Sequence, residues 1–175
     1  MTRNKRILFI CMGNICRSAA AEAVLKKAVE DKGLENEYFI DSAGIIGYHA
    51  GERADRRMIE AAYARGYRIT SVSRQVRPED FEKFDRIIAM DDSNVRGLKE
   101  VARQAASIYG HGRSSAYDFY ISKISKLTDF CTPGFLQANG MPTEVPDPYY
   151  GGAAGFQQVL DMLENSVISI IEKTK

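Results

Sequence analysis

Residues 7–18 place an apolar run, a cysteine, a short loop and the start of an amphipathic helix next to one another. Every position from Ile7 to Ile10 is apolar, which is typical of a strand buried on both faces of a parallel sheet. From Ser18, the expected N-cap, apolar residues recur at helical spacing at Ala21, Val24, Leu25, Ala28 and Val29. Residues 11–17 are therefore predicted to form a tight loop at a helix N-terminus, where free backbone N–H groups and the helix dipole favour an anion.

This loop contains the residue types needed to hold a phosphate dianion over a nucleophile. A Cys11 thiolate would be stabilised by the same N–H groups and dipole. Arg17 offers a planar pair of donors to two phosphate oxygens. Gly13 permits a positive φ, Asn14 tolerates the left-handed region, and Ser18 can donate a hydrogen bond to the sulfur. The predicted phosphate-binding residues are Met12, Gly13, Asn14, Ile15, Cys16, Arg17 and Ser18.

A purely structural interpretation of the loop is the alternative. Cysteine is commonly a small buried residue, and an arginine near a helix start is usually just solvated. The placement of both at a strand-to-helix junction, with Gly13 and Asn14 between them, favours the anion site. The glycine patterns of dinucleotide-binding and ATP-binding loops are absent.

A candidate proton donor lies far along the chain, at Asp147. It stands between Pro146 and Pro148, which restrict the backbone on both sides, and two tyrosines follow. A carboxyl group on such a stiffened loop suits a general acid that reaches into a pocket. An ordinary turn is the alternative, because Asp-Pro followed by Gly-Gly is also common turn chemistry.

Residues 11–18 and 147–150 together resemble the signature loop and the acid loop of the low-molecular-weight protein tyrosine phosphatases. The similarity runs from about Arg6 to Glu172 and includes residues 41–44, 48–52, 73–75 and 90–94. The resemblance implies an open four-stranded parallel sheet with helices on both faces, of the flavodoxin-like, phosphatase I type. Alternation of strand and helix patterns along the chain independently favours a parallel sheet covered on both faces.

The resemblance also implies a mechanism. Cys11 would attack phosphorus and form a phosphocysteine, Arg17 would hold the transition state, and Asp147 would act as general acid and then as general base. No cofactor and no metal are implied, and the substrates would be phosphotyrosine-containing proteins or, in vitro, small aryl phosphates. The resemblance assigns a supporting hydrogen-bond network to Asn14, Ser18 and Ser42, and an aromatic substrate rim to Tyr48, Tyr149 and Tyr150.

Two other functions remain open at this stage. A dithiol arsenate reductase shares this fold, but its chemistry needs further cysteines on a mobile segment, and there is none between Arg17 and Phe130. A non-catalytic phosphate-binding module would keep the loop without turnover.

Cys16 is expected to protect an oxidised Cys11 by forming a disulfide, or else simply to pack behind the loop.

The whole chain sets further limits. With 45% hydrophobic residues, 27% charged residues and a net charge of +1, it resembles a globular protein rather than a nucleic-acid binder. The N-terminal apolar run is too short for a membrane span or signal peptide, and three cysteines without framework spacing fit a reducing cytoplasm. We expect no membrane partner, a monomer or weak dimer, and no metal ligands at His49 or His111.

The 175 residues are expected to form one domain, 1–175. The predicted strands are 7–10, 38–41, 86–90 and 124–128, and the predicted helices are 18–32, 54–65, 93–105 and 152–172. The stretch 102–122 is rich in Gly, Ser and Tyr and is predicted to be an extended surface loop. Arg53, Arg56 and Arg57 fit either a substrate-facing basic patch or a solvated helix face.

Overall fold

The protein is described by a computed structural model that covers residues 4–140 and 143–174. Four parallel strands form one open sheet in the order β2-β1-β3-β4. This is the predicted four-stranded, flavodoxin-like α/β fold, and each predicted strand is present. The strands are β1 (Lys5–Cys11), β2 (Tyr38–Gly44), β3 (Arg86–Ala89) and β4 (Ile124–Lys126).

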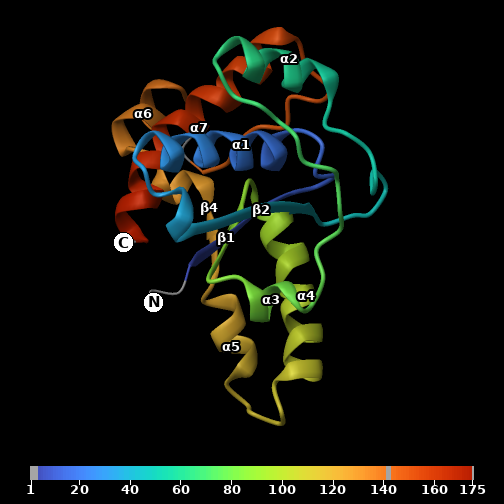
Figure 1. Cartoon of the computed structure of the whole chain (residues 1–175). Coiled ribbons are helices and arrows are strands. Elements are labelled where there is room, and N and C mark those ends of the chain that lie inside the picture. Colours follow the sequence, from blue (N-terminus) through green and yellow to red (C-terminus); the bar gives the residue numbers. More distant parts are fainter. Residues whose placement is uncertain (1–3, 141–142, 175) are drawn as a thin grey trace.

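Side chains of β1 alternate between two hydrophobic cores because successive residues of a strand point to opposite faces. Ile7 and Phe9 face the core under α1 (Arg17–Asp31), α2 (Arg56–Ala64) and α7 (Ala153–Lys173). Leu8 and Ile10 face the core under α3 (Asp80–Lys83), α4 (Asp92–Tyr109) and α5 (Ala116–Ile121). Figure 1 shows these two helix layers above and below the sheet, with α4 and α5 extending away from the body.

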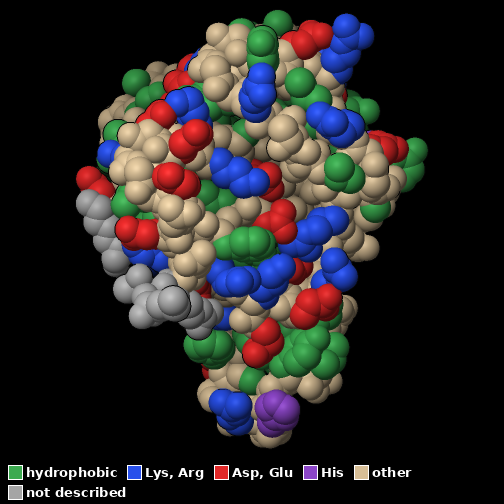
Figure 2. Space-filling model, viewed as in Figure 1, with side chains coloured by type: hydrophobic (Ala, Val, Ile, Leu, Met, Phe, Trp, Pro, Cys, Tyr) green, Lys and Arg blue, Asp and Glu red, His purple; other side chains and the backbone are tan. Residues whose placement is uncertain are grey.

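The predicted extended loop over 102–122 is wrong. Helix α4 continues to Tyr109, residues 110–115 form the turn, and α5 follows. Ala102 and Ala105 are fully buried and continue the apolar stripe that begins at Leu98, so the alanines extend the helix. Figure 2 shows a histidine at the tip of this helical arm and hydrophobic side chains on its surface. Ile108 of α4 and Phe119 of α5 are both exposed.

Several short elements were also not predicted. These are α3, α5, α6 (Pro133–Ala138) and the 3₁₀ turns η1 (Glu35–Glu37) and η2 (Leu127–Phe130). Because η2 begins at Leu127, β4 ends at Lys126 and is shorter than the predicted strand 124–128. A helix of one or two turns is not stable by propensity alone and depends on tertiary packing, here of Phe81, Tyr120 and Leu136. Ser18 is not the N-cap of α1, because the helix begins at Arg17 and the capping position is Cys16.

The carboxyl ends of the strands meet at one edge of the sheet, where ligands bind in such folds. Cys11 ends β1 and pairs with Gly44 at the end of β2. The backbone N–H of Val145 donates to Met90 O just after β3, at 2.9 Å, and so brings the segment before Asp147 to the same edge. Within residues 4–140 and 143–174, no helix is both long and apolar enough to cross a bilayer.

Candidate active site

A cavity of about 330 Å³ opens above the end of β1. The phosphate loop, which we define as residues 11–18, forms its floor, and the segment carrying Asp147 forms one wall. Its lining residues are Cys11, Met12, Gly13, Ile15, Cys16, Arg17, Ile46, Tyr48, His49, Asp147, Tyr149 and Tyr150. The structure thus brings the predicted nucleophile, arginine, acid and aromatic rim together, although they come from segments far apart in the sequence.

The phosphate loop keeps its backbone donors available. In the described part of the chain, none of the N–H groups of residues 12–16 donates to a backbone carbonyl. The positive φ falls on Asn14, at 57°, and not on Gly13. Gly13 instead leaves room for His49, since a Cβ there would lie 3.0 Å from His49 Cδ2 and the imidazole would have to shift by a few tenths of an ångström. A Cβ at Gly44 would lie 2.8 Å from Met12 O, so the end of β2 also passes directly beneath the loop.

A chain of buried hydrogen bonds leads away from the Cys11 sulfur. Ser18 Oγ lies 3.0 Å from Cys11 Sγ, and Asn14 Nδ2 donates to Ser18 Oγ at 2.9 Å and to Ser42 Oγ at 3.0 Å. Ser42 Oγ in turn donates to Glu22 Oε1 at 3.0 Å. Because Asn14 Nδ2 only donates, Ser18 Oγ accepts from it and keeps its own proton for the sulfur. The network therefore places a donor on Cys11, as a thiolate requires.

The two oxygen atoms of Asn14, the backbone O and the side-chain Oδ1, accept hydrogen bonds from residues 73 and 74. Ser73 Oγ donates to Asn14 O at 2.7 Å, and Arg74 N donates to Asn14 Oδ1 at 3.0 Å. The Arg74 guanidinium pairs with Asp41 and Asp80, each at 3.0 Å. No role was predicted for Glu22, Ser73 or Arg74. For Ser73 and Arg74 the signal was the resemblance of residues 73–75 to a family segment.

Arg17 is almost fully buried beneath the cavity. Its Nη1 donates to Asp91 Oδ2 at 2.7 Å and to Val145 O at 3.1 Å, while Nη2 lies 3.5 Å from Asp147 Oδ2. Burial alone would lower the pKa of Arg17, but the negative charges of Cys11, Asp91 and Asp147 outweigh it and raise the pKa. The guanidinium therefore stays charged, with its plane fixed by Asp91.

Asp147 is exposed at the mouth of the cavity. Its Oδ1 accepts the N–H of Tyr149 at 3.0 Å, which leaves Oδ2 directed towards Arg17. The tyrosine rings of the rim are edge-on, with Tyr149 and Tyr150 centroids 5.0 Å apart. Across the cavity Tyr48 packs edge-on against His49. The mouth of the cavity is therefore lined by aromatic rings, and its floor is the phosphate loop.

The three cysteines have different surroundings, and all are free. Burial, together with the nearby Cys11, raises the pKa of Cys16 well above its ordinary range, so this thiol stays protonated. Cys131 lies outside the cavity lining; its sulfur donates to Met162 O, and burial raises its pKa to about 11. Among the described residues, no cluster of three or more His, Cys, Asp or Glu side chains is arranged to hold a metal ion.

The three arginines near the start of α2 do not form a patch inside the cavity. Arg56 has 90% of its side chain exposed and pairs with Glu60 at 2.8 Å. Arg57 turns to Asp55 and to Tyr149 O. The solvated interpretation therefore holds for Arg56, whereas Arg57 contacts the segment that carries Asp147.

Comparisons with known proteins agree with this geometry. The family model described as low molecular weight phosphotyrosine protein phosphatase matches residues 6–175. The low molecular weight phosphotyrosine protein phosphatase of Schizosaccharomyces pombe is 36% identical over 97% of this chain and 99% of its own length. A protein of Synechocystis sp. bearing the family's name is 42% identical over 92% of this chain and 90% of its own.

A solved structure extends the likeness to three dimensions. The protein tyrosine phosphatase of Entamoeba histolytica, crystallised with Hepes in its active site, superposes with a TM-score of 0.81 at 42% identity. The match covers 97% of this chain and 96% of that one. The chain belongs to the low molecular weight phosphotyrosine protein phosphatase family, a family of phosphoric monoester hydrolases.

Proposed function

We propose that the protein hydrolyses phosphotyrosine and related aryl phosphate monoesters through a phosphocysteine intermediate. The observation that carries the proposal is the position of Cys11 at the floor of the cavity, with Arg17 beneath it and Asp147 at the mouth. Around it lie the N–H groups of residues 12–16, which donate to no backbone carbonyl of the described residues. Arg17 and the loop N–H groups supply the positive potential, so the mechanism needs no metal ion.

In the first half-reaction the Cys11 thiolate attacks phosphorus and the bond to the phenolic oxygen breaks. Asp147 gives its proton to the departing oxygen, so that a neutral phenol leaves. Arg17 and the loop N–H groups hold the equatorial oxygens of the transferring phosphoryl group, where positioning and charge complementarity supply most of the catalysis.

In the second half-reaction the Asp147 carboxylate takes a proton from water, and the oxygen of that water attacks phosphorus. The phosphorus–sulfur bond breaks and inorganic phosphate is released. The hydroxyl of Ser18, 3.0 Å from the sulfur, donates a hydrogen bond to the thiolate as it forms again. Asp147 thereby recovers its proton, and the enzyme is ready for another substrate.

The lining of the cavity supports an aryl phosphate as substrate. Ile15 and Ile46 are apolar, and Tyr48 and Tyr149 present ring faces and edges near the mouth. Hepes, which occupies the active site of the Entamoeba relative, carries a sulfonate that resembles phosphate in shape. A dithiol reductase is less well supported, because Cys131 lies in the core and not at the cavity.

Two variants test the proposal with two substrates: phenyl phosphate, whose phenolate is a poor leaving group, and p-nitrophenyl phosphate, whose phenolate is a good one. Cys11→Ser should lose turnover because serine does not ionise near neutral pH, yet should still bind inorganic phosphate. Asp147→Asn should lower kcat/KM, which reports the steps up to release of the phenol, about 10²–10⁴-fold for phenyl phosphate and much less for p-nitrophenyl phosphate. A tenth of the wild-type kcat remaining in Cys11→Ser would rule out the covalent mechanism.

We further propose redox protection by Cys16 in a reducing compartment such as the cytoplasm. Peroxide would oxidise the Cys11 thiolate to a sulfenic acid, and the Cys16 sulfur would displace water from it to form a disulfide that added thiols reduce. Both cysteines line the same cavity. Recovery after peroxide and dithiothreitol should be much poorer in Cys16→Ser than in the wild type or in Cys131→Ser, and equal recovery would refute the role.

A further inference from the structure

Arg57 connects two segments that the chemistry needs close together. Its Nε and Nη2 donate to Asp55 Oδ1 and Oδ2 at 3.1 and 2.9 Å, and Nη2 also donates to Tyr149 O at 3.1 Å. The guanidinium lies over two rings, 5.4 Å from the centroid of Tyr149 and 4.9 Å from that of Phe156. One side chain thus contacts the start of α2, the segment after Asp147 and the first turns of α7.

Asp55 continues this connection to the phosphate loop. Its backbone N–H donates to Ile15 O at 2.7 Å, and its carboxylate caps α2 by accepting from the N–H of Arg57 at 2.8 Å. The Asp55 side chain is only 11% exposed, and the hydrogen bond from Arg57 lowers its pKa. The carboxylate therefore remains charged at neutral pH and keeps the Arg57 fork in one plane.

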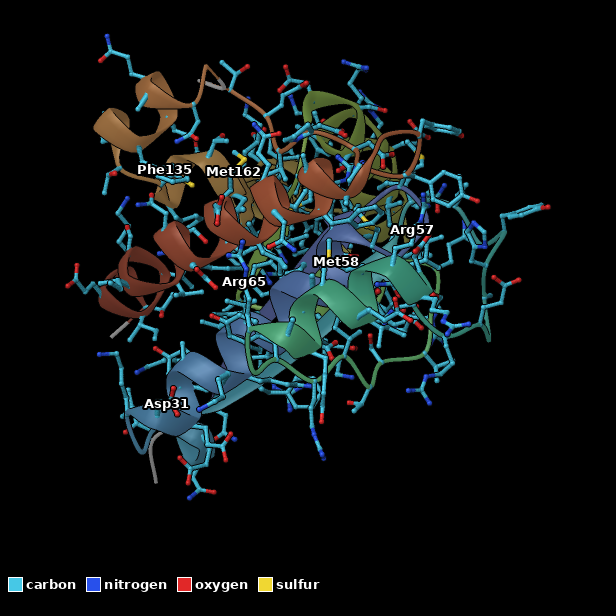
Figure 3. All side chains as sticks on the ribbon, turned by 90° about the horizontal axis from the view of Figure 1, so that it is seen from above. Asp31, Arg57, Met58, Arg65, Phe135 and Met162 are labelled. Carbon is cyan, nitrogen blue, oxygen red and sulfur yellow. The ribbon has the colours of Figure 1, made fainter. Side chains whose placement is uncertain are left out.

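Helix α2 is a fixed support for this pair. Met58 is fully buried between α2 and the neighbouring helices, and Arg65 at the far end pairs with Asp161 and Glu164 of α7. Figure 3 shows Arg57 and Arg65 at opposite ends of α2, with Met58 between them. Among the described residues, Arg57 and Arg65 are the side chains at the two ends of α2 that bond to the C-terminal segment, and it is Arg57 that reaches the residues beside Asp147.

Among the described residues, the part of the segment after Pro148 has fewer supports than the part before it. Val145 is held through Met90 O and Arg17, Asp147 pairs with Arg17, and Pro148 is buried. Residues 149–152 are exposed, and Gly151 N donates back to Pro148 O. We propose that Arg57 is a positioning residue: by holding the Tyr149 carbonyl, it keeps the Asp147 carboxyl at the mouth of the cavity. This inference rests on the proposed acid role of Asp147.

The test is Arg57→Met, which keeps an apolar stem over Phe156 and removes the fork. We expect kcat/KM for phenyl phosphate, which reports the steps up to release of the phenol, to fall about 10-fold to 100-fold, the range for a misplaced catalytic group. The loss with p-nitrophenyl phosphate should be much smaller, because that phenolate leaves without a proton, and inhibition by inorganic phosphate should not change. Arg57→Lys keeps the charge but not the fork and should resemble Arg57→Met.

Arg56→Met is the matched control, since it removes the neighbouring exposed arginine, whose hydrogen bond is to Glu60. Its kcat/KM should equal the wild-type value for both substrates. Thermal unfolding of all variants shows whether each is folded at the assay temperature. An equal loss with both substrates in Arg57→Met, or an equal loss in Arg56→Met, would overturn the positioning role.

The double variant separates this inference from the proposed function. In Asp147→Asn the acid is already absent, so adding Arg57→Met should lower kcat/KM for phenyl phosphate less than twofold further, as expected for residues that act as a unit. If the losses in the two single variants simply multiply in the double variant, the positioning role of Arg57 is wrong, while the acid role of Asp147 stands. Equal slowing of both substrates by Asp147→Asn itself would overturn the acid assignment, and the inference with it.

Discussion

Glu22 is a buried carboxylate that no catalytic step uses. Its side chain is 6% exposed, Oε1 accepts from Ser42, and Oε2 accepts from Lys26 at 2.9 Å. Burial raises the pKa of Glu22, and the nearby Asp41 adds to this, while the hydrogen bonds from Lys26 and Ser42 oppose it. Glu22 is the terminal acceptor of the network behind Cys11. Its carboxylate orients Ser42, and the burial of that charge lowers the stability of the folded state.

The raised pKa predicts how stability depends on pH at this residue. Below the unfolded pKa of about 4.3 both states hold the proton, so Glu22 contributes no pH dependence. As the pH rises from there through the higher folded pKa, the unfolded chain loses its proton first, and the folded state loses stability relative to a neutral residue. The unfolding free energy of Glu22→Gln minus that of the wild type should therefore increase between about pH 4 and 7.

Urea unfolding at several pH values measures this difference. Glu30→Gln is the matched control, because Glu30 is an exposed carboxylate of the same helix. A difference that falls as the pH rises would show that the partners of Glu22 outweigh its burial.

At the scale of elements, Asp91 joins helix α4 to the active site. Its Oδ1 accepts from Asn94 N at 2.8 Å and caps the helix, and its Oδ2 accepts from Arg17. The helix start and the arginine plane therefore depend on the two oxygens of one carboxylate. A change that keeps the cap but removes the charge can separate these two roles.

Asp91→Asn and Asp91→Ala make this separation. Both remove the charged partner of Arg17, so kcat/KM for p-nitrophenyl phosphate should fall about tenfold in each, the loss expected for one charge-assisted hydrogen bond. Only Asp91→Ala also removes the cap, so it should unfold with about 1 kcal/mol less free energy than Asp91→Asn. Wild-type kcat/KM in Asp91→Asn would leave Asp91 as a helix cap only.

Local patterns could be predicted from the sequence and long-range pairings could not. The unit from β1 through the phosphate loop to α1 follows from consecutive residues, and the prolines around Asp147 marked the second segment. Ser18 matched an N-cap locally, but its hydroxyl is used by Cys11 and Asn14 instead. Arg17 and Asp91 are separated by 74 positions, and no local pattern reveals which carboxylate an arginine will meet.

At the scale of the whole molecule, the site joins parts that fold from distant regions of the chain. The phosphate loop follows β1, Ser42 lies in β2, Asp91 follows β3, and Asp147 lies between α6 and α7. Parallel pairing forces the ends of β1, β2 and β3 to one edge, so the order of the sheet predicts that they meet. Ser42 and Asp91 hold Asn14 and Arg17 of the phosphate loop, so an anion bound by the loop would depend on several of these parts.

Phosphate binding should therefore stabilise the whole fold. A ligand that binds only the folded state adds RT ln(1 + [L]/Kd), about 2.7 kcal/mol at one hundred times Kd. We expect inorganic phosphate to raise the midpoint of thermal unfolding in the wild type and in Cys11→Ser, which keeps the loop N–H groups and Arg17. In Arg17→Met the shift should largely disappear, because the charged donors are gone, and chloride at matched ionic strength should give no such shift. An equal shift in Arg17→Met would mean that phosphate binds elsewhere, whereas a shift confined to proteins with an intact Arg17 would tie global stability to the site where the strand ends converge.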